Sequence, residues 1–336
     1  MKNILIDMPV HAEGMARLKS LQGIVVETIE PKEEVRDLPS HQIESVHFLF
    51  CTFPPRNLEV MHSLEFVQIA SAGYGQLIHL QLDRKGVRAC NGLGNFDVPI
   101  AEWNIAMMVN LARNLRGMIR NQESAVWDRS AVFQREIRGS VLGIWGYGGI
   151  GRETARLAKA LGLRVHVMTR QGIRPRQDAY RLDGTGDPDG VLPDKVFETS
   201  QEIEFLSALD FLVLAIPLTK GNEGIIGERQ LRALPRTAFL LNPARGPLVQ
   251  EQALLKALQE DWIAGAALDT HYAYPLAPNH PLWRFPNVIL TPHISGSAQS
   301  PRFLDRIWDI FVQNVERWLS GRCLLNELSI AQLRGE

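Results

Sequence analysis

Six residues near the middle of the chain, Gly146–Gly151, have the spacing Gly-x-Gly-x-x-Gly. The first glycine permits a tight turn, the second lets a pyrophosphate approach the backbone, and the third lets a helix pack closely on a strand. The motif alone is weak evidence, but it follows an apolar strand pattern, Val141–Trp145, and precedes a helical pattern, Ile150–Leu161. The free N–H groups at the start of such a helix attract phosphate. The predicted dinucleotide-binding residues are Gly146, Tyr147, Gly148, Gly149, Ile150 and Gly151, the alternative being a glycine-rich turn without a ligand.

The end of the next strand pattern, Arg164–Met168, indicates which dinucleotide is bound. An NAD site usually has Asp or Glu here to hold the ribose hydroxyls. This chain has Thr169, followed by Arg170, Arg174 and Arg176, so a 2′-phosphate would meet cations and no carboxylate. The sequence therefore predicts NADP(H) in preference to NAD(H), which stays possible. The alternative is that these arginines form a solvated surface turn.

The elements that position these residues alternate between strand and helix. The first hundred residues contain apolar strand patterns separated by helical ones, and a second series of strands begins at Val141. Such alternation is typical of parallel sheets with right-handed crossovers. The sequence predicts an α/β fold with two Rossmann-like or flavodoxin-like doubly wound parallel-sheet domains. The strands expected are residues 3–8, 46–52, 66–70, 87–90, 141–145, 164–168, 211–216, 238–241, 264–268 and 288–291.

Three longer segments complete this organisation. Residues 101–122 predict one long helix, apolar on more than one side, that bridges into the second domain. Residues 172–197 are rich in Gly, Pro and Asp, which is typical of a long surface loop. Residues 303–319 have helical spacing and end before Gly321.

Composition excludes several classes of protein. The chain has 336 residues, 45% of them hydrophobic and 22% charged, with a net charge of −1. These values favour a two-domain globular protein and disfavour binding to nucleic acid or to a membrane surface. The N-terminal apolar run is cut by Asp7, and no run is long enough to span a membrane. We therefore expect a cytoplasmic protein. Its three scattered cysteines, Cys51, Cys90 and Cys323, predict small buried side chains and no metal site.

Several blocks in a fixed order resemble the D-isomer-specific 2-hydroxyacid dehydrogenases, a family that includes the glyoxylate/hydroxypyruvate reductases. The resemblance covers nearly the whole chain. The blocks are Ser71–Gly75 (SAGYG), Pro99–Glu102 (PIAE), Gly146–Gly151, Pro217–Thr219 (PLT), Asn242–Val249 (NPARGPLV), Ala264–Asp269 (AGAALD) and Thr291–Ile294 (TPHI).

This resemblance implies an enzyme that moves a hydride between NAD(P) and a small 2-oxo or 2-hydroxy acid. Arg245 would bind the substrate carboxylate and polarise its carbonyl, with backbone N–H groups of Ala72 and Gly73 on the other side. His293 would donate the proton during reduction. Taken singly, each residue has a simple structural explanation, but together and in family order they favour catalysis. The further residues that the resemblance places at the dinucleotide are Pro217, Asn242, Ala244, Asp269, His293 and Gly296.

One position departs from the family pattern. The family has a glutamate that orients the catalytic histidine and raises its pKa, whereas this chain has Tyr274. A tyrosine hydroxyl can hydrogen-bond an imidazole but brings no negative charge. His293 would then titrate lower, or another carboxylate would replace the missing one, or the protein would be a weak or repurposed member. Formate dehydrogenases of the same superfamily also lack this glutamate, so hydride transfer is not excluded.

The resemblance also implies an architecture. Residues 1–100 with 296–336 would form the substrate-binding domain and residues 101–295 the dinucleotide-binding domain, with the site in the cleft between them and a homodimer as the assembly. The first hypothesis is a glyoxylate/hydroxypyruvate reductase-like enzyme. A second is a dinucleotide-sensing binding protein of the same superfamily with weak or no turnover. A third, ranked low, keeps hydride transfer but takes the hydride from formate or phosphite.

Overall fold

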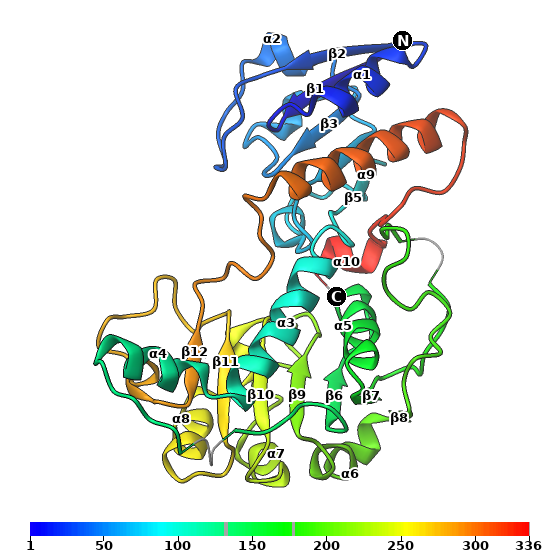
Figure 1. Ribbon diagram of the computed structural model, residues 1–336. Helices are drawn as coiled ribbons and strands as arrows, with labels where there is room; N and C mark the ends of the chain where they lie inside the picture. Colours follow the sequence, from blue (N-terminus) through cyan, green and yellow to red (C-terminus); the bar gives the residue numbers. More distant parts are fainter. Residues whose placement is uncertain (131–133, 177–178, 336) are drawn as a thin grey trace. The chain divides into compact units, whose positions relative to one another are not determined.

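The computed structural model describes residues 1–130, 134–176 and 179–335 and divides into two compact units (Figure 1). Unit 1 comprises Met1–Phe96, Gln177–Leu182 and Ala298–Glu336, and unit 2 comprises Asp97–Arg176 and Asp183–Ser297. Residues 179–182 group with unit 1, although they lie between the two segments of unit 2 in the sequence.

Unit 1 contains, among the described residues, a five-stranded parallel sheet of order β2-β1-β3-β4-β5. This is the 2-1-3-4-5 order of flavodoxin-like folds. The strands are β1 (Lys2–Asp7), β2 (Ile24–Thr28), β3 (Phe48–Cys51), β4 (Phe66–Ile69) and β5 (Arg88–Cys90). The helices are α1 (Ala12–Ser20), α2 (Ser40–Ile43), α9 (Pro301–Leu319) and α10 (Ile330–Arg334), with short 3-10 turns η1 (Leu58–Val60) and η2 (Gly75–Leu77).

The C-terminal helix α9 completes unit 1. Its apolar residues recur at helical spacing, so one side of the helix is buried while the other is polar. Trp308 and Phe311 pack on the sheet, and the rings of Phe311 and Phe50 stack with centroids 4.4 Å apart. A segment at the far end of the sequence is therefore part of the core that the first strands form.

Unit 2 contains, within the described residues, a seven-stranded parallel sheet of order β12-β11-β10-β9-β6-β7-β8. Read from β8, this is the Rossmann order 3-2-1-4-5-6 with one further strand. The two-domain α/β prediction is confirmed. The strands are β6 (Val141–Trp145), β7 (Arg164–Met168), β8 (Lys195–Phe197), β9 (Phe211–Leu214), β10 (Phe239–Asn242), β11 (Gly265–Leu268) and β12 (Val288–Leu290).

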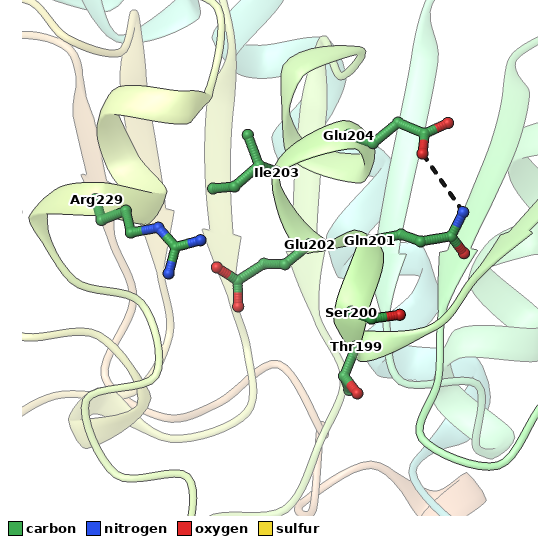
Figure 2. A pocket seen from close by; sticks show the side chains of 7 residues that line it. All are labelled: Thr199, Ser200, Gln201, Glu202, Ile203, Glu204 and Arg229. Atoms are coloured by element: carbon green, nitrogen blue, oxygen red, sulfur yellow. Dashed lines mark hydrogen bonds between the residues drawn. The ribbon is translucent and has the colours of Figure 1, made fainter.

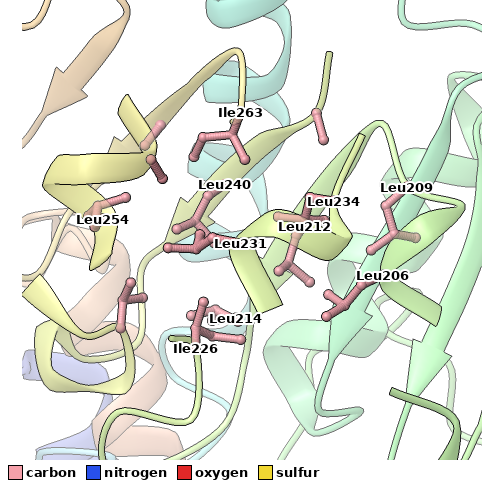
Figure 3. Packing of buried hydrophobic residues seen from close by; sticks show 14 of the residues in the cluster. Leu206, Leu209, Leu212, Leu214, Ile226, Leu231, Leu234, Leu240, Leu254 and Ile263 are labelled. Carbon is pink, nitrogen blue, oxygen red and sulfur yellow. The ribbon is translucent and has the colours of Figure 1, made fainter. Parts of the chain in front are cut away.

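Both faces of this sheet are covered by helices. Strand β9 shows why: Phe211 and Val213 pack with α3 and α5, whereas Leu212 and Leu214 pack with α6, α7 and α8. Figure 3 shows the second of these cores. The helices of unit 2 are α3 (Asp97–Ala112), α4 (Leu115–Glu123), α5 (Gly149–Ala160), α6 (Glu202–Ser207), α7 (Glu228–Ala233) and α8 (Glu251–Gln259), with 3-10 turns η3 (Thr199–Gln201), η4 (Gly246–Leu248) and η5 (Pro281–Arg284).

Three predictions about local structure were wrong, and one strand was missed. The single helix expected over 101–122 is two helices, because Asn114 adopts a left-handed conformation (φ +47°) and its side chain accepts the N–H of Gly117 to begin α4. Strand β8 lies inside the expected loop, and β2 was not predicted. Cys323 is exposed, although Cys51 and Cys90 are buried as expected.

Helices long and apolar enough to cross a membrane are absent from the described part of the chain. The same residues contain no group of His, Cys, Asp and Glu side chains that could bind a metal ion.

Candidate active site

The predicted site residues of unit 2 follow the carboxyl ends of its parallel strands. Gly146 follows β6, Thr169 follows β7, and Arg245, Asp269 and His293 come just after β10, β11 and β12. The strand order changes direction between β6 and β9, and ligands of doubly wound sheets bind at this point. The fold therefore brings these residues to one edge of one sheet, although they are up to 147 positions apart in the chain.

The glycine turn after β6 fits a pyrophosphate. Gly146 has a φ of +100°, and a side chain there would collide with the carbonyl oxygen of Ala215 at 2.6 Å. A Cβ on Gly151 would lie 2.5 Å from the carbonyl oxygen of Gly146, so only glycine lets α5 pack this closely. Gly148 begins α5 without a side-chain cap, and no atom lies within 4 Å of where its Cβ would be. The backbone at Gly148 is thus open to a ligand, and the N-terminal turn that follows it is of the kind that binds phosphate.

The need for glycine at position 149 was not predicted. A Cβ at this position would lie 1.7 Å from a carboxylate oxygen of Asp97, the first residue of α3. The carboxylate thus packs against the N-terminal turn of α5, where negative charge is favourable. Asp97 lies 52 residues before Gly149, and no local pattern in the sequence links the two.

The end of β7 carries no carboxylate. Thr169 is half-buried, its hydroxyl oxygen is inaccessible to solvent, and no described residue hydrogen-bonds it. Arg170 and Arg174 are exposed, and neither guanidinium forms an ion pair with any residue that the structure describes. Two cations are thus available beside the strand end at which a ribose is bound in Rossmann folds.

Arg245 is held by the turn that follows β10. The buried Asn242 side chain accepts the N–H groups of Ala244 (3.1 Å) and Arg245 (3.2 Å) and donates to the carbonyl of Arg245 (2.8 Å). The backbone is therefore fixed, while the guanidinium is exposed and donates only to the Ala244 carbonyl among the described residues of unit 2. Most of its five N–H donors are free to bind a carboxylate.

Asp269 anchors the turn that carries His293. Its fully buried carboxylate accepts four hydrogen bonds, from the Thr291 hydroxyl (2.6 Å), the Ile294 N–H (2.9 Å), and the N–H (3.1 Å) and hydroxyl of Ser295. The carbonyl of Asp269 also accepts the N–H of His293 at 2.8 Å. A carboxylate has about four acceptor positions, and protein donors fill them. A contact of this carboxylate with the dinucleotide, which the resemblance implied for Asp269, would have to displace one of them.

His293 and Arg245 act on each other electrostatically. Partial burial lowers the pKa of His293 below its ordinary value, the Arg245 guanidinium lowers it further, and Asp269 opposes both. The imidazole keeps an exposed side. Two of the three predicted catalytic residues are therefore close to each other at the same edge of the sheet.

Tyr274, the third predicted catalytic residue, does not take the place of the missing glutamate. Its ring lies 5.5 Å from the His293 imidazole, centroid to centroid, but its hydroxyl accepts the backbone N–H of His271 at 3.2 Å. The hydrogen bond to an imidazole that the sequence suggested is therefore absent in the described residues. No described carboxylate of unit 2 hydrogen-bonds the His293 imidazole either.

His271 supports the same turn. It is buried, and its Nε2 lies 2.8 Å from the carbonyl oxygen of Thr291. Because a carbonyl only accepts, Nε2 carries a proton, and no described residue hydrogen-bonds Nδ1. Thr291 is thus held from two sides, by His271 and by Asp269.

The predicted substrate loop lies in unit 1, after β4. Ser71 donates from its hydroxyl to the carbonyl of Gly73 (2.7 Å), and Asn91 donates to the carbonyl of Ala72 (2.7 Å). Within the described residues of unit 1, the N–H groups of Ala72 and Gly73 donate to no acceptor. Hydrogen bonds thus hold the carbonyl groups of Ala72 and Gly73 in place, and their N–H groups are available to bind a carboxylate.

Three further residues complete the predicted set. Pro217 follows β9, and its carbonyl accepts the side-chain amide of Asn222 at 2.7 Å. Gly296 follows the anchored Ser295, and Ile150 lies in the first turn of α5.

Figure 2 shows a hollow elsewhere on unit 2, lined by residues 199–204 and Arg229. It contains none of the predicted site residues. Three of its polar side chains bond to neighbours: Gln201 donates to Glu204 (3.4 Å), and Glu202 accepts from Gln230 (2.9 Å). Nothing in this hollow is suited to hydride transfer.

Comparisons with known proteins identify the family of this chain. Residues 105–295 match the model of the D-isomer specific 2-hydroxyacid dehydrogenase NAD-binding domain. A glyoxylate reductase of Aeropyrum pernix is 37% identical over 246 residues, 71% of this chain and 68% of that protein. A glyoxylate reductase of Thermofilum pendens is 28% identical over 92% of this chain and 88% of that protein.

A solved structure shares the fold. The NADPH-dependent glyoxylate/hydroxypyruvate reductase of Sinorhizobium meliloti, solved with NADP and sulfate, has a TM-score of 0.74 and 22% identity over all of both chains. The family model covers more than half of this chain, from the middle of α3 to the turn after β12. The chain belongs to the D-isomer-specific 2-hydroxyacid dehydrogenase family, whose members are oxidoreductases that use a nicotinamide dinucleotide.

Proposed function

We propose that this chain reduces a small 2-oxo acid to the D-2-hydroxy acid, with NADPH as the preferred reductant and glyoxylate and hydroxypyruvate as the first candidate substrates. The observation that supports this most strongly is the Arg245–His293 pair. A guanidinium without an ion-pair partner among the described residues lies close enough to an imidazole to affect its pKa. A carboxylate anchor and a proton donor are what reduction of a 2-oxo acid requires.

Each residue then has one task. Arg245 binds the substrate carboxylate and the carbonyl oxygen, which stabilises the negative charge that develops on that oxygen. His293 gives its proton to the same oxygen and regains a proton from solvent. The bound dinucleotide supplies the hydride that adds to the carbonyl carbon. One hydride and one proton convert the 2-oxo acid to the 2-hydroxy acid, and NADP⁺ is released.

The preference for NADPH is supported by the end of β7. Thr169 has no charge with which to repel a 2′-phosphate, and Arg170 and Arg174 have no competing ion pair among the described residues. Charge-assisted hydrogen bonds from arginine to phosphate are among the stronger polar contacts in proteins. NADH lacks the phosphate and would lose these contacts.

The direct test is NADPH oxidation, followed by absorbance, with a panel of 2-oxo acids. We expect turnover with glyoxylate or hydroxypyruvate and a higher kcat/KM with NADPH than with NADH. A protein that binds NADPH but turns over no 2-oxo acid would contradict the proposal. Chiral analysis of the glycerate formed from hydroxypyruvate should show the D-isomer, whereas the glycolate formed from glyoxylate is achiral.

We further propose a homodimer. Side chains on and after α3 and α4 expose large apolar surface, with Trp127 90% exposed and Val126 53% exposed. Ile119, Leu115 and Val109 are each at least 40% exposed on the same two helices. Apolar groups gathered in this way are typical of a subunit interface. Light scattering should give twice the mass of the chain, and Ile119→Lys should reduce it.

A cytoplasmic location is supported by the cysteines. Cys51, Cys90 and Cys323 are all free thiols, which is typical of proteins in reducing compartments. Fractionation of cells that express the chain with its own N-terminus would test this location.

The second candidate function is a dinucleotide-sensing binding protein with little turnover. The observation that favours it is the lack of a hydrogen bond from Tyr274, or from any described carboxylate of unit 2, to the His293 imidazole. Dinucleotide-dependent association with a partner or with itself, without NADPH oxidation, would support this alternative.

A further inference from the structure

The connection between β7 and β8 folds back onto the glycine turn. We call residues 184–192 the arm. Arg152, on α5 and only 6% exposed, reaches three carbonyl oxygens: those of Tyr147 in the glycine turn (3.2 Å), of Arg174 (2.6 Å) and of Asp187 in the arm. One buried guanidinium therefore joins the turn, the arginine-bearing segment after β7, and the arm.

Asp187 makes the second connection. It is 3% exposed, and its carboxylate accepts the phenol of Tyr147 at 2.6 Å. The same carboxylate accepts the N–H groups of Gly190 (3.1 Å), Val191 (3.0 Å) and Leu192 (3.0 Å), which fold the end of the arm around it. Although burial alone would raise the pKa of Asp187, the hydrogen bonds from Tyr147 and the backbone lower it, so the group is charged at neutral pH.

Other contacts hold the arm on α5. The buried carboxylate of Glu153 accepts the N–H of Gly186 and binds the guanidinium of Arg156 at 2.7 Å. Arg152 also lies over the Tyr147 ring, 4.9 Å from its centroid. Arg176 donates its N–H to the carbonyl of Pro188 at 2.9 Å. The segment expected as a surface loop is thus a buried polar network built on the first turns of α5.

We propose that the Arg152–Asp187–Tyr147 network positions the dinucleotide site: it fixes the backbone of Arg174 beside the glycine turn and so selects for a phosphorylated adenosine ribose. This inference rests on the proposed preference for NADPH. Arg174 is exposed and has no ion pair with a described residue, but its carbonyl is bound to Arg152. Holding a binding residue in place before the ligand arrives lowers the entropy cost of binding.

The network acts through other groups, so its three residues are positioning residues. Tyr147 is the first variable position of the glycine motif, 40 residues before Asp187. Loss of its hydroxyl would remove the direct bond between the glycine turn and Asp187 without removing a backbone group that could bind phosphate. A purely structural network would instead lower stability and weaken NADPH and NADH alike.

The test compares Tyr147→Phe and Asp187→Asn with the parent protein. Dissociation constants for NADPH and NADH are measured by fluorescence, together with those of 2′,5′-ADP and 5′-ADP, which isolate the 2′-phosphate. We expect each variant to bind NADPH and 2′,5′-ADP roughly five- to tenfold more weakly, with a change below about twofold for NADH and 5′-ADP. The double variant should bind NADPH no more weakly than the weaker single variant, because both substitutions act on the same Tyr147–Asp187 bond.

Lys159→Gln is the matched control. Lys159 lies on α5, and its ammonium group forms a surface ion pair with Asp194, just beyond the arm, at 2.8 Å. The substitution removes this ion pair and leaves the Arg152–Asp187–Tyr147 network intact. We expect no change in the NADPH/NADH ratio from this variant. An equal loss of both dinucleotides together with a lower Tm, or no change in either, would overturn the inference. A parent protein that itself prefers NADH would overturn the proposed cofactor preference instead, because the inference is judged on the change between variant and parent.

Discussion

Tyr274 contacts His293 with its ring, 5.5 Å between centroids, while its hydroxyl accepts the backbone N–H of His271. The position that carries a glutamate in the family pattern therefore gives His293 neither a hydrogen bond nor a negative charge. Burial and the Arg245 guanidinium both lower the pKa of the imidazole, and the buried Asp269 opposes them only in part. The pH dependence of the reaction should report this arrangement.

Reduction requires His293 in its protonated form, so the reductive rate falls as pH rises through its pKa. Because that pKa lies below the ordinary histidine value of about 6.5, the falling limb of kcat/KM should lie on the acidic side of neutrality. Oxidation of the 2-hydroxy acid needs neutral imidazole and should rise over the same range. A falling limb above pH 7.5 would contradict this explanation.

Tyr274→Glu should restore a negative charge beside His293. We expect the falling limb of the reductive pH profile to move up by about one unit, because an adjacent carboxylate favours the imidazolium. Tyr274→Phe is the matched control: it removes only the hydroxyl, which bonds to His271, and should leave the limb within about 0.3 units. A large shift with Phe would show that the hydroxyl acts on His293 directly.

Arg245→Ala should raise KM for the 2-oxo acid and lower kcat, because both the carboxylate anchor and carbonyl polarisation are lost. A combined loss in kcat/KM of roughly 10²–10³-fold is expected from removing such a group. The control is Arg229→Ala, because Arg229 is also an exposed arginine and lies in the hollow of Figure 2, away from the predicted site. Steady-state kinetics of the two variants are compared. Equal kinetics for the two variants would refute the role of Arg245.

Thr169→Asp should shift the cofactor preference toward NADH. The new carboxylate would repel a 2′-phosphate and accept hydrogen bonds from ribose hydroxyls. The measurement is the ratio of kcat/KM for NADPH to that for NADH, which should fall at least tenfold, since about 1.4 kcal/mol of repulsion is sufficient. An unchanged ratio would mean that the end of β7 is not the ribose site.

Asp269→Asn should destabilise the protein and slow catalysis together. The new amide nitrogen would face donors that now bind a carboxylate oxygen, so about 2–3 kcal/mol of stability should be lost. Urea denaturation measures the stability, and kcat should fall because the turn that carries His293 loosens. Unchanged stability with a raised KM for the dinucleotide would show instead that Asp269 serves the nicotinamide.

The sequence was sufficient for the two doubly wound sheets, because buried parallel strands are continuous apolar runs such as Phe211–Leu214 and helices carry a 3.6-residue pattern. The glycine turn was also predictable, since its strand and helix flank it directly. The break between α3 and α4 was not, because it depends on the left-handed conformation of Asn114, a residue that also occurs within helices.

Contacts between residues far apart in the chain could not be predicted from the sequence. The Asp187–Tyr147 bond and the packing of Asp97 on Gly149 join positions 40 and 52 residues apart, and no local periodicity records them. Asp269 was recognised as a site residue from its block, but the four donors around its carboxylate became known only from the folded turn. The hydrogen bond between the Tyr274 hydroxyl and the backbone of His271 likewise could not be predicted, because it depends on how the turn folds.

The most direct test of the central claim, that Arg245 and His293 act together on a 2-oxo acid, is a single-turnover measurement with His293→Ala. NADPH binding is measured on the same sample by fluorescence, and the hydride-transfer rate with glyoxylate or hydroxypyruvate is measured by stopped flow. We predict a rate lower by roughly 10²–10⁴-fold with NADPH affinity unchanged. A variant that binds NADPH and transfers hydride as fast as the parent protein would contradict the claim.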